Sequence, residues 1–370
     1  MQPFLGPTAG NPSSLHQAGR AARGAIDDAR DALAGVLGCS QGEVVFTSGG
    51  TEANNLALRG VLAAGADRGQ HVVISAVEHE AVSNTCADLA RHGVAEITVI
   101  GCDSGGRVDP GEVAAAVRPD TVVVSVMLVN NEVGTVQDLS AIASAVKDRN
   151  PVTVVHTDAA QALGRLPIAV ASLGVDLMTL SAHKAYGPKG AGALYVRRGV
   201  VVGAQITGGG QERGRRSGTE NVPAIVGFGV AAPRAEARRD MEMARQRRLA
   251  ERLRERVVAL VPDVRLCGST LHSVAGIITF AFADVRSEVL VTALDRLGVC
   301  ASGGSACSSG ATLPSHVLAA MGVESAYVSG PLRCSLGEQT TEEDIDRAVI
   351  AIGQVVTPEL YEAAARERQG

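Results

Sequence analysis

A single lysine stands between a short apolar run and a glycine/proline turn. The run ends at Leu180, the turn begins at Gly187, and Lys184 lies between them in the sequence Ser-Ala-His-Lys-Ala-Tyr-Gly. A lysine at the end of a buried strand is costly to keep charged, so the neutral amine is favoured. A neutral amine can form a Schiff base with an aldehyde. The alternative is a surface-loop lysine, and we prefer the Schiff base because four other segments fit the same chemistry.

A second segment joins a strand to a helix through glycines. It reads Phe-Thr-Ser-Gly-Gly-Thr-Glu over residues 46–52. Free backbone N–H groups and the Thr51 hydroxyl at the start of that helix would form a phosphate site, with Gly50 in the turn. The alternative is an ordinary threonine N-cap. The glycine spacing matches neither a Walker motif nor a dinucleotide-binding motif.

Three polar residues follow other apolar strands. Asp158, in His-Thr-Asp-Ala-Ala-Gln, could pair with a protonated pyridine nitrogen or cap a helix. His79 comes after the strand that ends at Ser75, where an imidazole could stack on a flat ring and move protons, or be a plain loop residue. Asn131, in Asn-Asn-Glu-Val-Gly, could bring an amide to a ring oxygen or simply form a turn.

Cations and a thiol complete the set of candidates. Segment 208–221 combines glycines, arginines and Thr219, which favours anion binding over a solvated basic loop. Arg333 lies in an expected strand and could form a bidentate hydrogen bond with a substrate carboxylate, or an interdomain salt bridge. Cys307 lies among Gly, Ser and Ala in segment 302–310, which favours a reactive thiolate on an exposed loop over an incidental thiol. The other cysteines lie in or beside apolar segments, as packing residues do: Cys39, Cys86, Cys102, Cys267, Cys300 and Cys334.

Regular elements must hold these residues in place. From about residue 40 to 200, short apolar runs alternate with helical patterns, which indicates a largely parallel sheet with helices on both faces. Ligands of such sheets bind beyond the carboxyl ends of the strands. The expected strands are 44–47, 71–75, 97–100, 121–126, 152–158, 175–180 and 192–196. The expected helices are 51–63, 80–92, 110–117 and 140–149.

The rest of the chain predicts a smaller α/β domain. Residues 233–260 read as one long helix whose apolar stripe is Leu249, Leu253, Val257 and Leu260. Its acidic and basic residues are interleaved, which is typical of a solvated face and not of nucleic-acid binding. Strand, helix, helix, strand and helix are then expected at 276–282, 287–297, 315–321, 331–335 and 341–356.

Composition excludes several classes of protein. The chain has 370 residues and a net charge of −5, which allows two domains and gives no attraction to nucleic acid or an anionic membrane. The longest apolar run, 121–129, is too short to span a bilayer, and residues 1–5 have no basic or long apolar stretch, so we expect no secretion signal there. Seven cysteines without metal-ligand spacing indicate a reducing cytoplasm and no metal site.

Taken in order, these motifs resemble the cysteine desulfurases of the iron–sulfur cluster-assembly type. These enzymes depend on pyridoxal 5'-phosphate (PLP) and belong to the class V aminotransferase family. The resemblance runs from Gly10-Asn11-Pro12 to the C-terminal helices, and Glu-His, Asp-Ala-Ala-Gln, His-Lys, Arg-Ser-Gly-Thr and Gly-Ser-Ala-Cys are its specific motifs.

The resemblance also implies a fold. This is the α/β PLP-dependent transferase type I fold, with a large domain whose mostly parallel sheet is flanked by helices and a smaller C-terminal α/β domain. We expect these domains at 1–237 and 238–370, with the active-cysteine loop at 301–313, and we expect a homodimer.

The resemblance implies a role for each candidate residue. Lys184 would hold PLP as a Schiff base, Asp158 would pair with the pyridine nitrogen, and His79 would stack on the ring. Arg333 and Asn131 would hold the substrate carboxylate. Gln161 and Asn131 would bind the ring oxygen. The phosphate would be bound by Gly50, Thr51, Ser181 and His183, and by Thr219 of the neighbouring subunit.

The implied activity converts L-cysteine to L-alanine. Lys184 would remove the Cα proton, the Cys307 thiolate would take the substrate sulfur as a persulfide, and His79 with Lys184 would return protons for alanine release. The persulfide would pass to a sulfur-acceptor protein, such as a cluster scaffold or a tRNA-thiolation carrier, in the cytoplasm.

The chain departs from the family at its start. Only nine residues precede Gly10, where family members usually have a strand and an Ala-Thr-Thr turn, so we expect substrate positioning to be affected more than PLP binding. Alternatives are a selenocysteine lyase, another class V aminotransferase or lyase with no use for Cys307, and a truncated non-catalytic scaffold. The presence of Lys184, Asp158, His79 and Cys307 favours the desulfurase.

Overall fold

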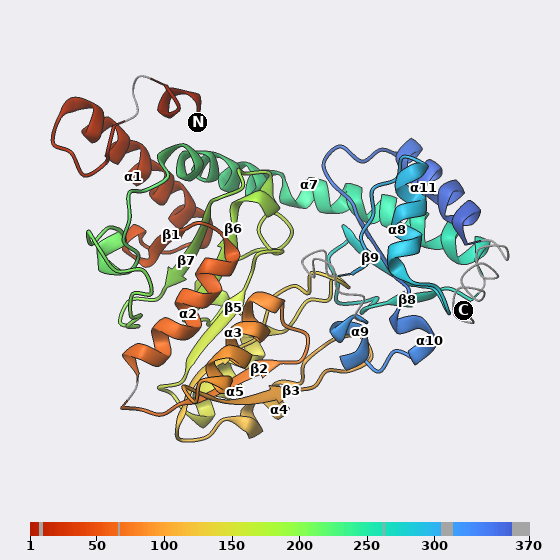
Figure 1. The fold of residues 1–370 in the computed structure, drawn as a ribbon, viewed down its shortest axis with the longest axis horizontal. Coiled ribbons are helices and arrows are strands. Elements are labelled where there is room, and N and C mark those ends of the chain that lie inside the picture. The colour runs from red at the N-terminus through yellow and green to blue at the C-terminus, as the bar shows by residue number, and fades with distance from the viewer. Residues whose placement is uncertain (7–9, 66, 262, 305–313, 357–370) are drawn as a thin grey trace. The chain divides into compact units, whose positions relative to one another are not determined.

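The computed structural model describes residues 1–6, 10–65, 67–261, 263–304 and 314–356 (Figure 1). The described chain forms two compact units. Unit 1 comprises Met1–Ile100, Val108–Val129 and Gln137–Arg239, and unit 2 comprises Gly101–Arg107, Asn130–Val136 and the chain from Asp240 onward. The division into domains at 237/238 stays a prediction. Cys307 and most of the expected loop 301–313 lie outside the described residues.

Unit 1 is built on one large sheet. Its strand order is β1-β7-β6-β5-β4-β2-β3, and β7 alone runs antiparallel to both of its neighbours in this sheet. The sheet is therefore mostly parallel, as predicted. The strands are β1 (Val44–Thr47), β2 (His71–Ser75), β3 (Glu96–Ile100), β4 (Thr121–Ser125), β5 (Val154–Asp158), β6 (Leu177–Ser181) and β7 (Gly192–Val196).

The apolar runs form strands because the middle of this sheet is covered on both faces. Every residue of β2, β4, β5, β6 and β7 is buried, whereas β3, at the sheet edge, is partly exposed. The helices of unit 1 are α1 (Gln17–Leu37), α2 (Gly50–Ala64), α3 (Glu80–Arg91), α4 (Pro110–Ala116), α5 (Leu139–Arg149), α6 (Val170–Leu173) and the first part of α7 (Val222–Leu260). Helices α2 and α3 share a hydrophobic core with strands of the sheet, including Leu58, Val82, Val123 and Leu177.

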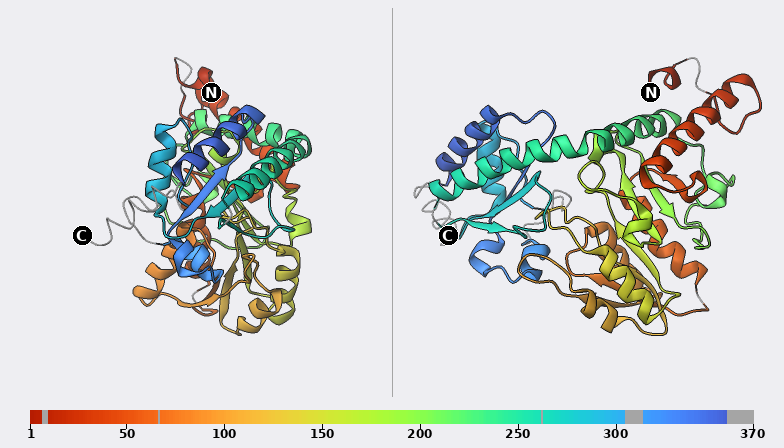
Figure 2. Two further views of the ribbon diagram at one scale, coloured as in Figure 1. Left: turned by 90° about the vertical axis from the view of Figure 1, so that its right-hand side faces the viewer. Right: turned by 180° about the vertical axis from the view of Figure 1, so that it is seen from behind.

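Helix α7 is longer than the sequence predicted. The expected helix starts at residue 233, but α7 begins at Val222 and continues through Pro233 as one long ribbon (Figure 2). The early segment packs on α1, since a Cβ on Gly229 would lie 2.5 Å from the Cα of Ala29. This close contact requires glycine, and burial against α1 explains why the helix extends in front of the proline.

Unit 2 contains a small antiparallel sheet with helices. The strand order is β10-β9-β8, and Phe280, Leu253 and Leu332 lie in its core. Its elements are β8 (Arg265–Cys267), β9 (Ile277–Ala281), α8 (Ser287–Arg296), α9 (His316–Ala320), α10 (Ser325–Val328), β10 (Pro331–Ser335) and α11 (Glu342–Val355). Across the described parts of both units, we find no helix with the length and apolar character needed to cross a bilayer.

Candidate active site

The predicted phosphate turn connects β1 to α2. β1 ends at Thr47 and α2 begins at Gly50, so the N–H groups of the first helical turn are left for a ligand. β7 lies directly against this turn, because a Cβ on Gly192 would be only 2.6 Å from the carbonyl carbon of Gly49. Glycine at position 192 therefore lets the turn approach the sheet. Thr51 is exposed at the start of the helix, where its hydroxyl can bind an anion.

Ser181 and His183 lie beside that turn. A Cβ on Gly50 would be 3.6 Å from the Cβ of Ser181, and Ser181 Oγ is 2.9 Å from His183 Nδ1. Burial, with the charges of Lys184 and Lys189 in addition, lowers the pKa of His183, so its imidazole is held neutral. The structure thus brings together Gly50, Ser181 and His183 in an arrangement of donors suited to a phosphate group.

Lys184 follows β6 directly. It is half-buried in the 3-10 turn Ala182–Ala185, and Tyr186 then adopts a left-handed backbone conformation with φ 61°. Strand β5 pairs with β6 in parallel, with Asp158 opposite Thr179. Asp158 and the segment that carries Lys184 therefore leave the sheet at the same edge, as the sequence predicted.

Asp158 is held on both carboxylate oxygens. Oδ1 accepts the N–H of Ala160 at 2.9 Å, and Oδ2 accepts the side-chain amide of Asn54, on α2, at 2.7 Å. Asp158 is buried and Asn54 is 1% exposed. Hydrogen bonds from two donors stabilise an ionised carboxylate in one orientation.

Gln161 has a fixed amide. Arg165 Nη1 donates to both the backbone carbonyl and Oε1 of Gln161, at 2.9 and 2.8 Å. Because Oε1 faces the guanidinium, the NH₂ group of this buried glutamine is directed elsewhere as a donor. Such a donor suits a phenolate oxygen on a ring.

His79 caps helix α3. Its Nδ1 accepts the N–H of Ala81 at 3.0 Å, so in the neutral imidazole the proton lies on Nε2. The ring is half-buried. His79 is therefore arranged to donate a proton or hydrogen bond through Nε2.

Glu78, next to His79, is a fully buried carboxyl group. Its Oε1 accepts the Ser75 hydroxyl at 2.5 Å and the Met127 N–H at 2.8 Å. Burial, with the negative charge of Asp158 in addition, raises the pKa of Glu78 to about 8 against the lowering effect of these hydrogen bonds. Glu78 is thus mostly protonated at neutral pH.

This arrangement makes the stability of the protein depend on pH. The folded chain binds the Glu78 proton more tightly than the unfolded chain does. The free energy of unfolding therefore falls as pH rises from the pKa of glutamate in the unfolded chain, 4.5, to the raised pKa of about 8 in the folded chain. Glu78→Gln keeps both hydrogen bonds to Oε1 and removes the titration. We expect the variant to match the wild type near pH 5 and to exceed it by roughly 2–4 kcal/mol near pH 8.5.

Urea unfolding of both proteins at the two pH values measures this difference. Glu112→Gln, an exposed glutamate on α4, is the control and should leave the pH dependence unchanged. If Glu78→Gln changed the free energy of unfolding by the same amount at both pH values, Glu78 would be ionised in the folded protein.

The candidate substrate-binding residues lie in unit 2. Arg333, on β10, donates from Nη1 to the backbone carbonyl of Asn131 at 2.9 Å. Its backbone also forms an antiparallel bridge with Ser302, with N···O distances of 2.7 and 3.1 Å. The structure therefore brings Asn131, Arg333 and the first residues of the expected cysteine loop together.

Glu132 touches residues on both sides of segment 305–313. Its carboxylate is 1% exposed, and Oε2 accepts the Ser315 hydroxyl at 2.6 Å. A Cβ on Gly304, where φ is +86°, would lie 2.9 Å from the same oxygen. The Asn-Asn-Glu turn thus supports the chain on either side of the segment that contains Cys307.

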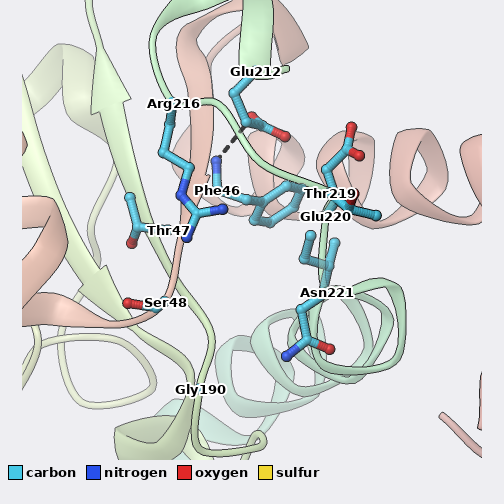
Figure 3. Close-up of a pocket in the computed structure, with 10 residues that line it drawn as sticks. Phe46, Thr47, Ser48, Gly190, Glu212, Arg216, Thr219, Glu220 and Asn221 are labelled. Carbon is cyan, nitrogen blue, oxygen red and sulfur yellow. Dashed lines mark hydrogen bonds between the residues drawn. The ribbon is translucent and has the colours of Figure 1, made fainter. Parts of the chain in front are cut away.

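Thr219 lines a small pocket in unit 1. The pocket has a volume of about 160 Å³ and lies between the end of β1, with Thr47 and Ser48, and the segment 212–221 (Figure 3). Three ion pairs hold that segment: Arg30–Glu212, Arg216–Glu52 and Arg23–Glu220. The Arg30–Glu212 pair is buried, with two hydrogen bonds of 2.7 and 2.8 Å. Thr219 itself is exposed.

Most of the described cysteines are kept as thiols. Burial raises the pKa of Cys39 and Cys267 to about 11 and that of Cys86 and Cys334 to about 12, and it also raises the pKa of Cys102. These residues agree with the predicted packing role. Cys300 is exposed, so the packing prediction is wrong for it.

Four residues at the site were missed by the sequence reasoning: Asn54, Glu78, Arg165 and Glu132. Asn54 carried a usable signal, since it shares a helix face with Ala57, Leu58 and Val61, which are apolar and buried. A polar residue on such a face needs a hydrogen-bond partner.

Comparisons with known proteins agree on one family. The family described as aminotransferase class-V matches residues 1–348. The cysteine desulfurase IscS of Methanosarcina thermophila is 42% identical over 96% of this chain and 87% of its own length. Among solved structures, a NifS-like protein superposes with a TM-score of 0.90 at 35% identity, covering 96% of this chain and 93% of the other. A structure described as SspA in complex with cysteine has a TM-score of 0.77 at 32% identity, covering 90% of this chain and 93% of that one.

Proposed function

Since the chain belongs to the class-V aminotransferases and is a cysteine desulfurase, we propose that it converts L-cysteine to L-alanine with PLP bound in unit 1. The observation that carries this proposal is the meeting of the α2 N-terminus, Ser181, His183, Lys184 and Asp158 at one edge of the large sheet. A related structure was solved with cysteine, which supports the choice of substrate.

The residues present fit PLP chemically. Gly50, Thr51, Ser181 and His183 would hold the phosphate, and Asp158 would pair with a protonated ring nitrogen, since it is a buried carboxylate already fixed by two donors. Gln161 would donate to the ring oxygen through the NH₂ group that Arg165 leaves available. When bound, PLP supplies an electron sink for the charge left as the substrate Cα loses its proton.

Lys184 and His79 would handle the protons. The Lys184 amine would hold the cofactor aldehyde, and its Nζ would accept the Cα proton of the substrate. His79 would stack on the ring, and its neutral tautomer presents Nε2–H as the donor during alanine release.

Cys307 would take the sulfur. Its thiolate attacks the substrate sulfur, an S–S bond forms as the Cβ–S bond breaks, and the electron pair of that bond goes to the substrate carbon, which is later protonated as alanine. The persulfide would then go to the thiol of an acceptor protein, such as a cluster scaffold or a thiolation carrier. We also propose a homodimer, in which each subunit lends Thr219 to the other phosphate site, and a cytoplasmic location.

Arg333 and Asn131 would hold the substrate carboxylate. A guanidinium gives two parallel hydrogen bonds to a carboxylate and an ammonium cannot, so we expect Arg333→Met to raise KM for L-cysteine by roughly 10- to 100-fold and Arg333→Lys to give a smaller increase. Initial rates at varied L-cysteine concentration measure this. Arg347→Met, whose side chain is 75% exposed on α11, is the matched control. A normal KM in Arg333→Met would remove Arg333 from the substrate site.

The direct test of the function is product formation. The protein, incubated with PLP, a reducing thiol and L-cysteine, should release sulfide and alanine in equal amounts. Formation of neither product by a protein that has bound PLP would contradict the proposal.

A further inference from the structure

Asn54 is a buried amide with one strong interaction. It lies on α2 with 1% of its surface exposed, and its Nδ2 is 2.7 Å from Asp158 Oδ2. A buried amide is costly unless its polar atoms are hydrogen-bonded. Within the residues that the structure describes, Asn54 Oδ1 has no hydrogen-bond partner. The amide therefore leaves its carbonyl oxygen unsatisfied and keeps its donor on Asp158.

This orientation follows from the charge of Asp158. An ionised carboxylate has only acceptors, so it can accept from the NH₂ group of Asn54 but not from its carbonyl. The other carboxyl group, Glu78, is close enough for the two charges to interact, and its environment keeps it protonated at neutral pH. Of the two carboxyl groups, Asp158 is the one that accepts from the Asn54 amide, at 2.7 Å.

Helix α2 links this donor to the phosphate turn. Thr51 and Asn54 are three positions apart, so they lie on neighbouring parts of the same helical face. One rigid element thus presents phosphate donors at its first turn and a donor to Asp158 in the next.

We infer that Asn54 is a positioning residue, which holds Asp158 ionised and in a fixed orientation for a protonated ring nitrogen. The inference rests on the proposed role of Asp158 in binding PLP. Removing the Asn54 donor should weaken the interaction of Asp158 with the protonated ring nitrogen. The residues that bind phosphate or substrate are not changed. We expect a tenfold lower proton affinity of the ring nitrogen, equivalent to about 1.4 kcal/mol.

The test uses the full chain loaded with PLP that carries ¹⁵N in its ring, and the ¹⁵N chemical shift reports ring protonation as pH is varied. In Asn54→Leu, which has a similar volume and no donor, the transition should move to lower pH. Asn55→Leu changes the adjacent asparagine of the same helix and should titrate like the wild type, because the Asn55 amide donates to Thr51 O and accepts from Arg59 Nε, away from Asp158. Circular dichroism verifies that each variant is folded.

A second variant keeps the test decisive if Asn54→Leu does not fold. In Asn54→Asp the two adjacent carboxyl groups share a proton, so a donor to Asp158 exists at low pH and is lost as pH rises. We expect the ring nitrogen to be protonated as in the wild type at low pH and to lose its proton at a lower pH than in the wild type. Wild-type titration of this variant over the whole range would overturn the inference, as would wild-type titration of Asn54→Leu.

Asp158→Asn separates the inference from the function on which it rests. If Asp158→Asn loses ring protonation and the Asn54 variants keep it, the positioning role is wrong and the role of Asp158 stands. If Asp158→Asn also titrates like the wild type, the proposed role of Asp158 fails, and the inference about Asn54 fails with it.

Discussion

Replacing Cys307 by alanine lowers sulfide release from L-cysteine by at least about a thousandfold, because the substrate sulfur then has no thiolate to receive it. PLP binding should not change, since the proposed cofactor contacts all lie elsewhere. We therefore expect the absorbance of the bound cofactor to equal that of the wild type. Sulfide and alanine assays with the reducing thiol held constant measure the loss.

Cys300→Ala is the matched control for this variant. Cys300 is an exposed free thiol on the same part of the chain, and its loss should leave turnover within about twofold of the wild type. Full alanine production by Cys307→Ala would point to a class V lyase or aminotransferase that has no use for this thiol.

Replacing Lys184 by alanine has a comparably large effect through a different step. Both the bond to the cofactor aldehyde and the base for the Cα proton depend on its amine, so we expect turnover to fall at least roughly 10⁴-fold. The long-wavelength absorbance of the bound cofactor should disappear, and borohydride should no longer fix PLP to the chain. Spectra and mass measured after borohydride reduction record both changes.

Lys189→Ala provides the comparison for that experiment. Lys189 is an exposed lysine in the same turn, and it should still give a protein with wild-type absorbance and turnover. If borohydride attaches PLP to Lys184→Ala as it does to the wild type, another lysine holds the cofactor.

Much of the fold could be predicted from the sequence because buried parallel strands are continuous apolar runs. Strands β1, β2, β7 and β10 have the predicted bounds, and β3, β4, β5, β6 and β9 differ at their ends by one or two residues. The short strand β8 was not predicted. Helix α1 was missed, since its buried face is made largely of small residues such as Ala22, Ala29 and Ala34. The early part of α7 was missed for a similar reason: Gly229 contacts α1, and Pro233 has the pattern of a helix start.

The residues with chemistry of their own could be found, and those that act through another residue could not. Lys184, Asp158 and His183 stand in distinctive local sequences at strand ends. Asn54 is far from Asp158 along the chain, and their contact exists only because α2 packs on the sheet beside β5. The same holds for Glu132, whose contacts with Ser315 and Gly304 depend on the folding of unit 2.

The raised pKa of four described cysteines has a consequence for the fidelity of the proposed sulfur delivery. Sulfane sulfur migrates between thiols by exchange, and only a thiolate accepts it. A thiol with a pKa of about 11, such as Cys39 or Cys267, is deprotonated in about one molecule in ten thousand at pH 7, and Cys86 and Cys334 are deprotonated less often still. A sulfur atom loaded on Cys307 as proposed would therefore not migrate to these four thiols, and an external thiolate would be the better acceptor.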